Sequence, residues 1–255
     1  MPLIPPSPAR VIAIDTSRPT GSVAAYNPRQ TPVAGQPATA ADAIDDAVFS
    51  ETFDTPADHA RLLAGGIERT CHLAGWQPRE ADLVGVVVGP GSFTGLRVGV
   101  TAAKVLAWAS GCSLVGISAF DLLAHRCGRW AVHSWPDAES LELAFDAGRG
   151  EVHAATAARC ESSPAGWDVA PSRLLTRDAW IASLAAGAIV VSPLGSDVCA
   201  ARDDLRCVPE ELSRTTAADT AMLAVRQAAA GRLAEPATLI PEYLRPSYAE
   251  EPRRR

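Results

Sequence analysis

Short apolar runs alternate along this chain with longer segments in which apolar residues recur every three or four positions. Val11–Asp15 is an apolar run that ends in aspartate, and Gly21–Tyr26 follows after a short polar turn, which indicates a strand and its hairpin partner. The same pattern predicts further strands at Ala47–Phe53, Val84–Val88, Leu114–Ile117, Leu141–Phe145, Glu151–Ala157, 166–175 and Ala188–Val191. It predicts helices from Thr55 through Ala74, after Gly91 up to Gly111, to about Cys127, at Thr176–Ala186 and at Thr215–Gly231. Such alternation is typical of α/β layers.

The first predicted helix has a clear start and an unusual middle. Thr55 suits the N-cap, Pro56 suits the first helical position, and Asp58 stands three positions after the cap. Gly65 and Gly66 are poor helix formers in its interior. They indicate either close packing against another backbone or a locally weak surface helix.

The second half of the chain repeats a pattern of the first. Ala13-Ile-Asp15 precedes a turn and a returning apolar strand, and Ala144-Phe-Asp146 does the same. A repeated unit suggests two related lobes. We therefore expect a disordered lead at 1–9, an N-terminal lobe at 10–117, a C-terminal lobe at 118–214, and a helix and tail at 215–255 that packs back on the lobes. The segment 27–43, rich in Pro and Ala, is predicted to be a flexible loop.

A glycine turn links the strand Val84–Val88 to the next helix, and this segment suits two functions. A strand, a turn at Gly89-Pro-Gly91 and a helix start can present backbone N–H groups to a phosphate. In the helix itself, Gly95, Gly99 and Ala103 recur every four positions and would let another helix approach closely. The turn lacks the Gly-Lys-Ser/Thr end of a P-loop and the spacing of a dinucleotide fingerprint.

A second polar turn, Asp15-Thr-Ser17, stands at the end of the first predicted strand. Its aspartate could hold a metal–phosphate, and its hydroxyl groups could bond phosphate oxygens. The alternative is ordinary turn chemistry, in which Asp and Ser satisfy nearby backbone N–H groups and glycine supplies a positive φ. The candidate phosphate-binding residues of the two turns are Asp15, Thr16, Ser17, Gly91 and Ser92.

Composition and spacing exclude several classes of protein. A net charge of −6 argues against a free-standing nucleic-acid binder, which would have a basic surface. The five histidines show no i, i+4 pair, and no nucleophile elbow is present, so we expect no metal site and no hydrolase triad. The six cysteines are scattered without Cys-x-x-Cys and are expected to be free, mostly buried thiols. No signal peptide and no membrane-length apolar run is found, so we expect a cytoplasmic protein.

Four blocks of the sequence resemble the bacterial TsaB proteins, also called YeaZ. They stand in the order of that family: Ala13-Ile-Asp-Thr-Ser17, Gly89-Pro-Gly-Ser-Phe-Thr-Gly-Leu-Arg-Val-Gly99, Phe145-Asp-Ala-Gly-Arg-Gly-Glu-Val152 and Pro241-Glu-Tyr-Leu-Arg245. The resemblance implies a two-lobed, actin-like (ASKHA) α/β fold with a duplicated mixed sheet flanked by helices. It also implies a non-catalytic partner of a TsaD-like subunit in tRNA threonylcarbamoyladenosine synthesis, joined by a TsaE-like ATPase. The chain would contact tRNA only as part of the assembled complex.

The family forms its partner interface from the first two helices, which map here to His59–Ala74 and Gly95–Ala109. The resemblance thus implies that the TsaD-like subunit, or a second copy of the chain when alone, would contact the following residues: His59, Leu62, Leu63, Gly66, Ile67, Gly95, Gly99, Ala102 and Ala103. This subunit would need no cofactor of its own, and the complex would use ATP and Mg²⁺.

Two other functions stay open from the sequence. An actin-like ATP-binding enzyme, such as a small-molecule kinase, would use Asp15, Gly91 and Ser92. A peptidase is the weaker alternative, because the chain has neither the H-x-x-x-H metal pair of the catalytic TsaD-like proteins nor a recognisable triad.

Overall fold

A computed structural model describes residues 10–27, 48–54 and 56–243 of the chain. The chain divides into two compact units. The first comprises the segment up to Ile117 together with Thr216–Glu242, and the second begins at Ser118 and extends to Thr215. The expected lead at 1–9, most of the expected loop at 27–43 and the end of the expected tail lie outside the described residues.

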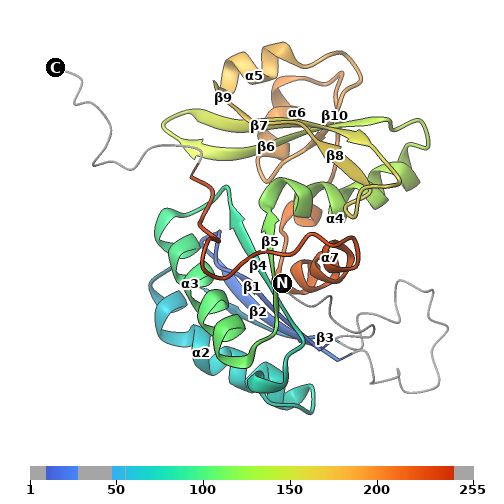
Figure 1. Ribbon diagram of the computed structural model, residues 1–255. Coiled ribbons are helices and arrows are strands. Elements are labelled where there is room, and N and C mark those ends of the chain that lie inside the picture. Colours follow the sequence, from blue (N-terminus) through green and yellow to red (C-terminus); the bar gives the residue numbers. More distant parts are fainter. Residues whose placement is uncertain (1–9, 28–47, 55, 244–255) are drawn as a thin grey trace. The chain divides into compact units, whose positions relative to one another are not determined.

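The first unit is built on a five-stranded sheet in the order β3-β2-β1-β4-β5 (Figure 1). Strands β1 and β2 form an antiparallel hairpin in which Asp15 pairs with Ser22, and β1 runs parallel to β4. Their apolar side chains are buried on both faces, which explains the continuous apolar runs in the sequence. The strands are β1 (Val11–Asp15), β2 (Gly21–Tyr26), β3 (Val48–Phe53), β4 (Leu83–Gly89) and β5 (Ser113–Ser118).

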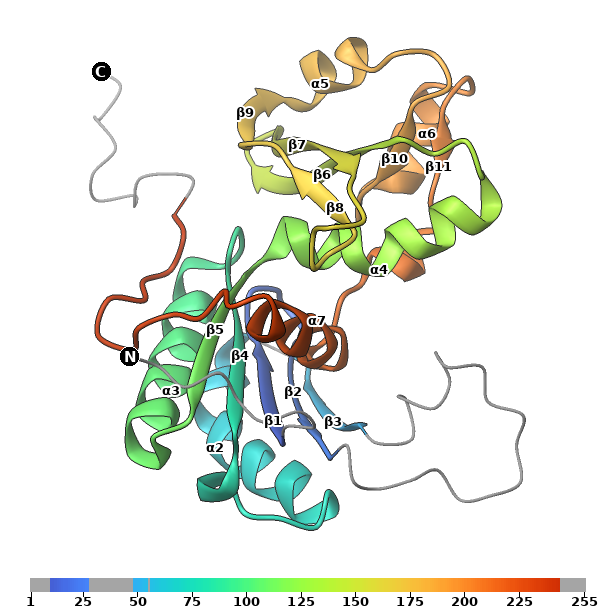
Figure 2. The same cartoon turned by 45° about the vertical axis from the view of Figure 1, so that its right-hand side comes forward.

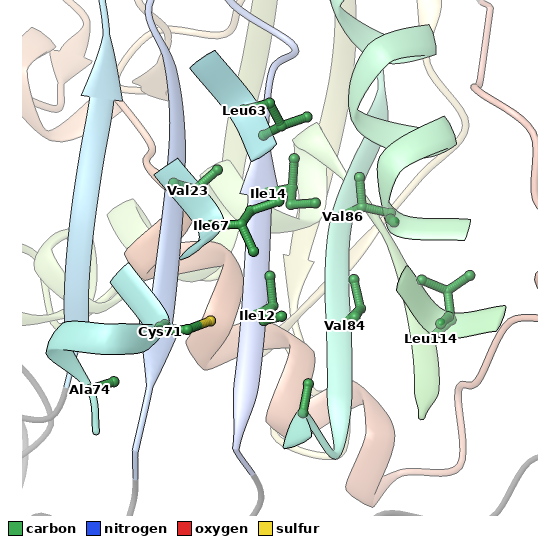
Figure 3. Close-up of a cluster of buried hydrophobic side chains, with 14 of the residues drawn as sticks. Ile12, Ile14, Val23, Leu63, Ile67, Cys71, Ala74, Val84, Val86 and Leu114 are labelled. Atoms are coloured by element: carbon green, nitrogen blue, oxygen red, sulfur yellow. The ribbon is translucent and has the colours of Figure 1, made fainter. Parts of the chain in front are cut away.

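Two long helices cover one face of this sheet. Helices α2 (Pro56–Leu73) and α3 (Phe93–Ser110) bury their inner residues against Ile12, Ile14 and Val86 in one apolar cluster (Figure 3). A short 3-10 turn, η1 (Pro78–Glu80), leads from α2 to β4. The C-cap of α3 is Gly111, whose φ of +69° is the left-handed conformation that glycine adopts at helix ends.

A third helix and an irregular segment complete the first unit. Helix α7 (Ala217–Ala229) packs against β1, β2 and β4. Thr216 and Asp219 form its capping box, and the Ala217 N–H donates to Ser22 Oγ at 2.8 Å. Residues 234–242, here named the strap, then return along β5 and β4 and pass α3 (Figure 2).

The second unit repeats the strand plan of the first around a six-stranded sheet, in which five strands have the order β11-β10-β6-β7-β8 and the sixth, β9, also pairs with β7. As in the first unit, a hairpin (β6–β7) has its first strand parallel to a later strand, β10. This shared plan confirms the expected duplication. The elements are α4 (Ala119–Ser134), β6 (Ser140–Gly148), β7 (Glu151–Arg159), β8 (Trp167–Val169), β9 (Arg173–Thr176), α5 (Arg177–Ser183), β10 (Ile189–Val191), α6 (Gly195–Ala201), β11 (Arg206–Cys207) and η2 (Glu210–Ser213).

The structure differs from the sequence predictions at four places in the second unit. Residues 166–175 hold two short strands, β8 and β9, because their pairing with the same strand, β7, shifts by one residue between them. Helix α4 continues beyond Cys127 to Ser134, and α6 was not predicted. Cys199 and Cys207 form a disulfide with a Cα–Cα distance of 6.5 Å, so the expectation that all six thiols are free is wrong.

Candidate functional site

A groove of about 650 Å³ lies on the outer side of the α2–α3 helix pair. Its walls are mostly apolar, and Glu68 and Arg97 supply the charged groups. We name it the α2–α3 groove; its lining residues are Ala60, Leu63, Ala64, Ile67, Glu68, Pro78, Arg97, Val98, Thr101, Ala102, Val105 and Leu106. An apolar hollow between two helices is a common place for another molecule to bind.

Large apolar side chains stand exposed on the two helices that form this groove, and one of them, Val105, lines it. Trp108 is 82% exposed and Val105 57% exposed on α3, and Leu73 is 62% exposed at the end of α2. The Arg97 guanidinium lies 4.0 Å from the centre of the Phe93 ring at the start of α3, an arrangement that favours cation–π attraction. Exposed tryptophan is costly in water, and clustered apolar surface of this kind often marks a protein contact. We name the outer surface of α2 and α3, with the groove, the docking face.

Only some of the residues predicted for the partner interface lie on the docking face. Leu63, Ile67 and Ala102 line the α2–α3 groove, and Leu62 is half-buried against the core cluster. Their contact with a partner stays a prediction.

On α2, two predicted interface residues point inward. His59 is 1% exposed, and its Nε2 donates to the Pro19 carbonyl oxygen at 3.1 Å. A Cβ on Gly66 would lie 2.8 Å from Phe53 Cζ. His59 and Gly66 therefore pack against strands of their own unit. Close packing explains Gly66, whereas a Cβ on Gly65 would meet only the Arg69 side chain of the same helix.

On α3, the small-residue stripe also faces the sheet, which corrects the expectation of a small face open to a partner helix. A Cβ on Gly95 would collide with the Thr16 carbonyl oxygen, and one on Gly99 would collide with Thr16 Oγ1. Ala103 is fully buried. These residues bring α3 close to β1, so they serve the fold of this unit and not the contact surface.

The two candidate phosphate turns lie together, and their polar groups bond one another. Ser17 donates to Asp15 Oδ1 through its N–H at 2.9 Å and its Oγ at 2.6 Å. The Ser92 N–H donates to the Ser17 carbonyl oxygen at 2.7 Å, and the Ser92 Oγ accepts from the Gly95 N–H at the start of α3. Gly91 has no room for a side chain beside Ser17. The arrangement joins the end of β1 to α3, as the turn-chemistry alternative expects.

Asp15 is the chemically unusual group of this cluster. Its side chain is buried, and the loss of water around the carboxylate raises its pKa, although the hydrogen bonds from Ser17 and the charge of Arg18 oppose the rise. Thr16 next to it donates to the Gly95 carbonyl oxygen at 2.8 Å. Nucleotide binding by these residues stays a prediction.

The sequence did not single out Trp108, Val105 or Arg97, although a signal was present. Helix α3 carries apolar residues on its outer side as well as its inner side, whereas a helix that covers a sheet has one polar face. The outer apolar positions, including Trp108, were the available sign of a contact surface.

The described residues contain neither a cluster of metal ligands nor a helix that could span a membrane. No group of three His, Cys, Asp or Glu side chains there could hold a metal ion. Among the helices of that same part of the chain, none combines the length and the hydropathy needed to cross a bilayer.

Comparisons with known proteins agree on one family. A family model described as tRNA N6-adenosine threonylcarbamoyltransferase, TsaD, matches residues 54–189. Two curated relatives are both named tRNA threonylcarbamoyladenosine biosynthesis protein TsaB. The Bacillus subtilis protein is 33% identical over 98 residues, which are 38% of this chain and 36% of that protein. The Escherichia coli protein is 27% identical over 154 residues, 60% of this chain and 57% of that protein. The chain thus matches less than two thirds of the length of either relative.

Among solved structures, YeaZ from Pseudomonas aeruginosa has a TM-score of 0.67 and 21% sequence identity, with 92% of this chain and 100% of that chain covered. A second structure, described as an uncharacterized protein with similarity to peptidase YEAZ from the same organism, gives the same TM-score and identity. These matches, with the duplicated sheets, confirm the two-lobed actin-like fold.

Proposed function

The chain belongs to the TsaB (YeaZ) branch of the TsaD family, and on this premise we propose that it takes part in tRNA threonylcarbamoyladenosine synthesis as a non-catalytic partner subunit. Its role would be to bind and activate a TsaD-like catalytic subunit through the docking face. A TsaE-like ATPase would join this pair, and the chain would contact tRNA only within the assembled complex.

The exposed apolar surface of α3 is the observation that carries this proposal. Trp108, at 82% exposure, and Val105 gain most from being covered, because each apolar Å² removed from water contributes about 25 cal/mol. The neighbouring α2–α3 groove could receive apolar side chains from a partner. A central aromatic beside an apolar pocket is the usual composition of an energetic hot spot in a protein interface.

The hydrogen bonds within and between the two polar turns also favour a non-catalytic subunit over an ATP-binding enzyme. The Ser17 and Ser92 groups that would meet a phosphate already bond to Asp15 and to the start of α3. A nucleotide would have to replace these bonds with its own.

The partner role is tested by mixing the chain with the TsaD-like protein of the same organism. We expect light scattering after size-exclusion chromatography to show a 1:1 complex. Trp108→Ser should weaken the affinity, measured by calorimetry, at least about tenfold, because a hot-spot truncation costs roughly 2 kcal/mol or more. Leu174→Ser is the matched control, since Leu174 is also exposed but lies on β9 in the other unit.

Absence of a complex, or a complex equally tight with Trp108→Ser, would contradict the proposal. In the first case, calorimetry of the isolated chain with Mg-ATP would decide whether the enzyme alternative deserves preference. Tight binding that is lost in Ser92→Ala would support that alternative.

A further inference from the structure

The disulfide between Cys199 and Cys207 lies at one edge of the sheet in the second unit. Strand β11, which carries Cys207, is the last strand in the order and pairs with β10, and helix α6, which carries Cys199, packs against β11 (Figure 2). The two cysteines are eight positions apart in sequence. The disulfide therefore closes a short local loop and does not join distant parts of the chain.

Both halves of this disulfide are partly exposed to solvent. Cys71 and Cys127, by contrast, have no exposed surface at all. A thiolate can open a disulfide only if it reaches one of the two sulfur atoms, and exposed disulfides are accordingly the more labile ones. The position at the sheet edge gives a reductant access to the pair without unfolding of the unit.

The elements on either side of the disulfide are also held by other contacts. Val198, fully buried, anchors α6 in the apolar cluster of this unit. On the strand side, the Arg206 N–H donates to the Ala188 carbonyl oxygen at 3.0 Å, and the Val208 N–H donates to that of Val190 at 2.9 Å. These contacts would keep the two cysteines opposite each other after the disulfide opens, so the same pair could close again.

The loop between the cysteines has its own contacts as well. The Arg202 guanidinium donates to both carboxylate oxygens of Asp204, each at 2.6 Å. It also donates to the carbonyl oxygens of Ile181 and Leu184 at the end of α5, at 3.3 and 3.4 Å. Since a bidentate contact fixes the guanidinium, the loop keeps its path independently of the disulfide.

We propose that Cys199–Cys207 is a reversible redox site that a soluble dithiol reduces in the folded chain, and that its opening frees the last turn of α6 from β11. The proposal concerns the second unit alone, so it stands or falls independently of partner binding through the docking face.

The reaction is a two-step thiol–disulfide exchange. A thiolate of the dithiol attacks one cysteine sulfur and forms a mixed disulfide, and the other cysteine leaves as a thiolate that takes up a proton. The second thiol of the reductant then attacks its own sulfur in the mixed disulfide and releases the first cysteine. The protein gains two electrons and two protons, and the dithiol is oxidised to its disulfide.

The first test labels thiols of the folded chain. The chain is treated with reduced dithiothreitol and then with iodoacetamide without denaturant, and each cysteine peptide is quantified by mass spectrometry. Label on Cys199 and Cys207 should rise at least about tenfold on reduction, because both sulfur atoms become free thiols at an accessible edge. After dialysis against oxidised dithiothreitol, the label on both should fall to its starting value.

Two cysteines of the same unit serve as internal controls. Cys160 is free and partly exposed, so reductant should not change its label. Cys127 is buried, and its Sγ donates to the Leu212 carbonyl oxygen at 3.2 Å, so it should stay unlabelled while the unit is folded.

Three outcomes of the labelling would overturn the proposal. In the first, Cys199 and Cys207 become labelled only together with Cys127, which would mean that the disulfide opens only on unfolding. In the second, reductant leaves both unlabelled. In the third, both are labelled before reduction and oxidised dithiothreitol does not protect them.

The second test measures amide hydrogen exchange in the oxidised and reduced chains. The Arg202 N–H, which donates to the Val198 carbonyl oxygen at the end of α6, should exchange about tenfold faster after reduction, because α6 loses its link to β11. The Val208 N–H should keep its protection, since its bond to β10 does not depend on the disulfide.

The double variant Cys199→Ser with Cys207→Ser should match the reduced parent at both amides and should not respond to dithiothreitol. If the variant fails to fold, the reduced parent alone decides the question. Loss of protection at Val208 on reduction would show a structural disulfide, and unchanged exchange at Arg202 would show that its opening frees nothing; either result contradicts the proposal.

Discussion

At the residue scale, Asp15 shows how one carboxyl group can serve the fold at an energetic cost. Its Oδ1 accepts two hydrogen bonds from Ser17 and so shapes the end of β1. Because the group is buried, its pKa is raised above the ordinary value of an aspartate. The folded state consequently binds a proton at this site more tightly than the unfolded state does.

Substitution of Asp15 by asparagine should therefore change the pH dependence of stability. Stability from a protonated Asp15 is fully present below its unfolded pKa and is lost as pH rises through the raised folded pKa. Asp15→Asn keeps the acceptor oxygen for Ser17 and carries no charge. We expect its free energy of unfolding, from urea titrations between pH 4 and pH 8, to exceed that of the parent by an amount that grows with pH.

The matched control is Asp203→Asn, since Asp203 is exposed in the turn after α6. It shows what an Asp-to-Asn change does to the same urea titrations at a position exposed to solvent. A stability difference for Asp15→Asn that shrinks as pH rises would show that the buried carboxylate is favourably solvated in the folded state.

At the scale of elements, helix α3 has two apolar sides with different tasks. The inner side carries Gly95, Gly99 and Ala103, which allow close approach to β1. The outer side carries Ala102, which lines the α2–α3 groove. A helical period shows which residues share a face, but it does not show which neighbour that face meets.

Two leucine substitutions on adjacent turns of α3 separate these sides. Gly99→Leu should destabilise the first unit by roughly 3 kcal/mol, because the side chain collides with Thr16 and Ile14 and such overpacking is costly. Ala102→Leu should leave the melting temperature within a few degrees of the parent but fill the groove and weaken partner binding.

Differential scanning calorimetry and partner titration check these expectations. If Gly99→Leu folds normally and loses only the partner, the small-residue stripe is a contact surface after all. If Ala102→Leu binds the partner as the parent does, the groove does not take part in docking.

At the scale of the whole molecule, the docking face should affect the behaviour of the isolated chain. Trp108 and Val105 lie exposed when no partner is present, and an apolar face left in water tends to pair with its own copy in a symmetric dimer. The net charge of −6 is small enough to permit such pairing.

We therefore expect the chain alone to form a homodimer that the TsaD-like subunit replaces. Light scattering over a range of concentrations should show the dimer for the parent and for Leu174→Ser, and a monomer for Trp108→Ser. A dimer that persists in Trp108→Ser would place the self-contact on another surface.

Much of the fold could be predicted from local pattern. The bounds of β1 and β2 were predicted correctly, because a buried strand is a continuous apolar run with a turn at its end. The glycine end of α3 and the start of α5 were also predicted, since caps depend on residues close in sequence. The disulfide was missed, because pairing of Cys199 with Cys207 depends on how α6 and β11 meet.

The candidate site was predicted less completely. Its residues on α2 and α3 were all predicted to contact a partner. Leu63, Ile67 and Ala102 line the groove, and their contact with a partner stays a prediction, whereas His59, Gly66, Gly95 and Gly99 face the sheet. The strap was expected only as a helix and tail that packs back, since residues 234–242 show no regular period.

The sequence by itself determined the alternation of strands and helices, the duplicated hairpin plan and the family, because these depend on local periodicity and on short motifs. Tertiary structure decided which side of α3 is buried, that the two glycine turns bond each other, and that the strap lies beside Lys104. The physical reason is that burial and hydrogen bonding between distant segments depend on how the sheet brings them together, and no local pattern specifies that meeting.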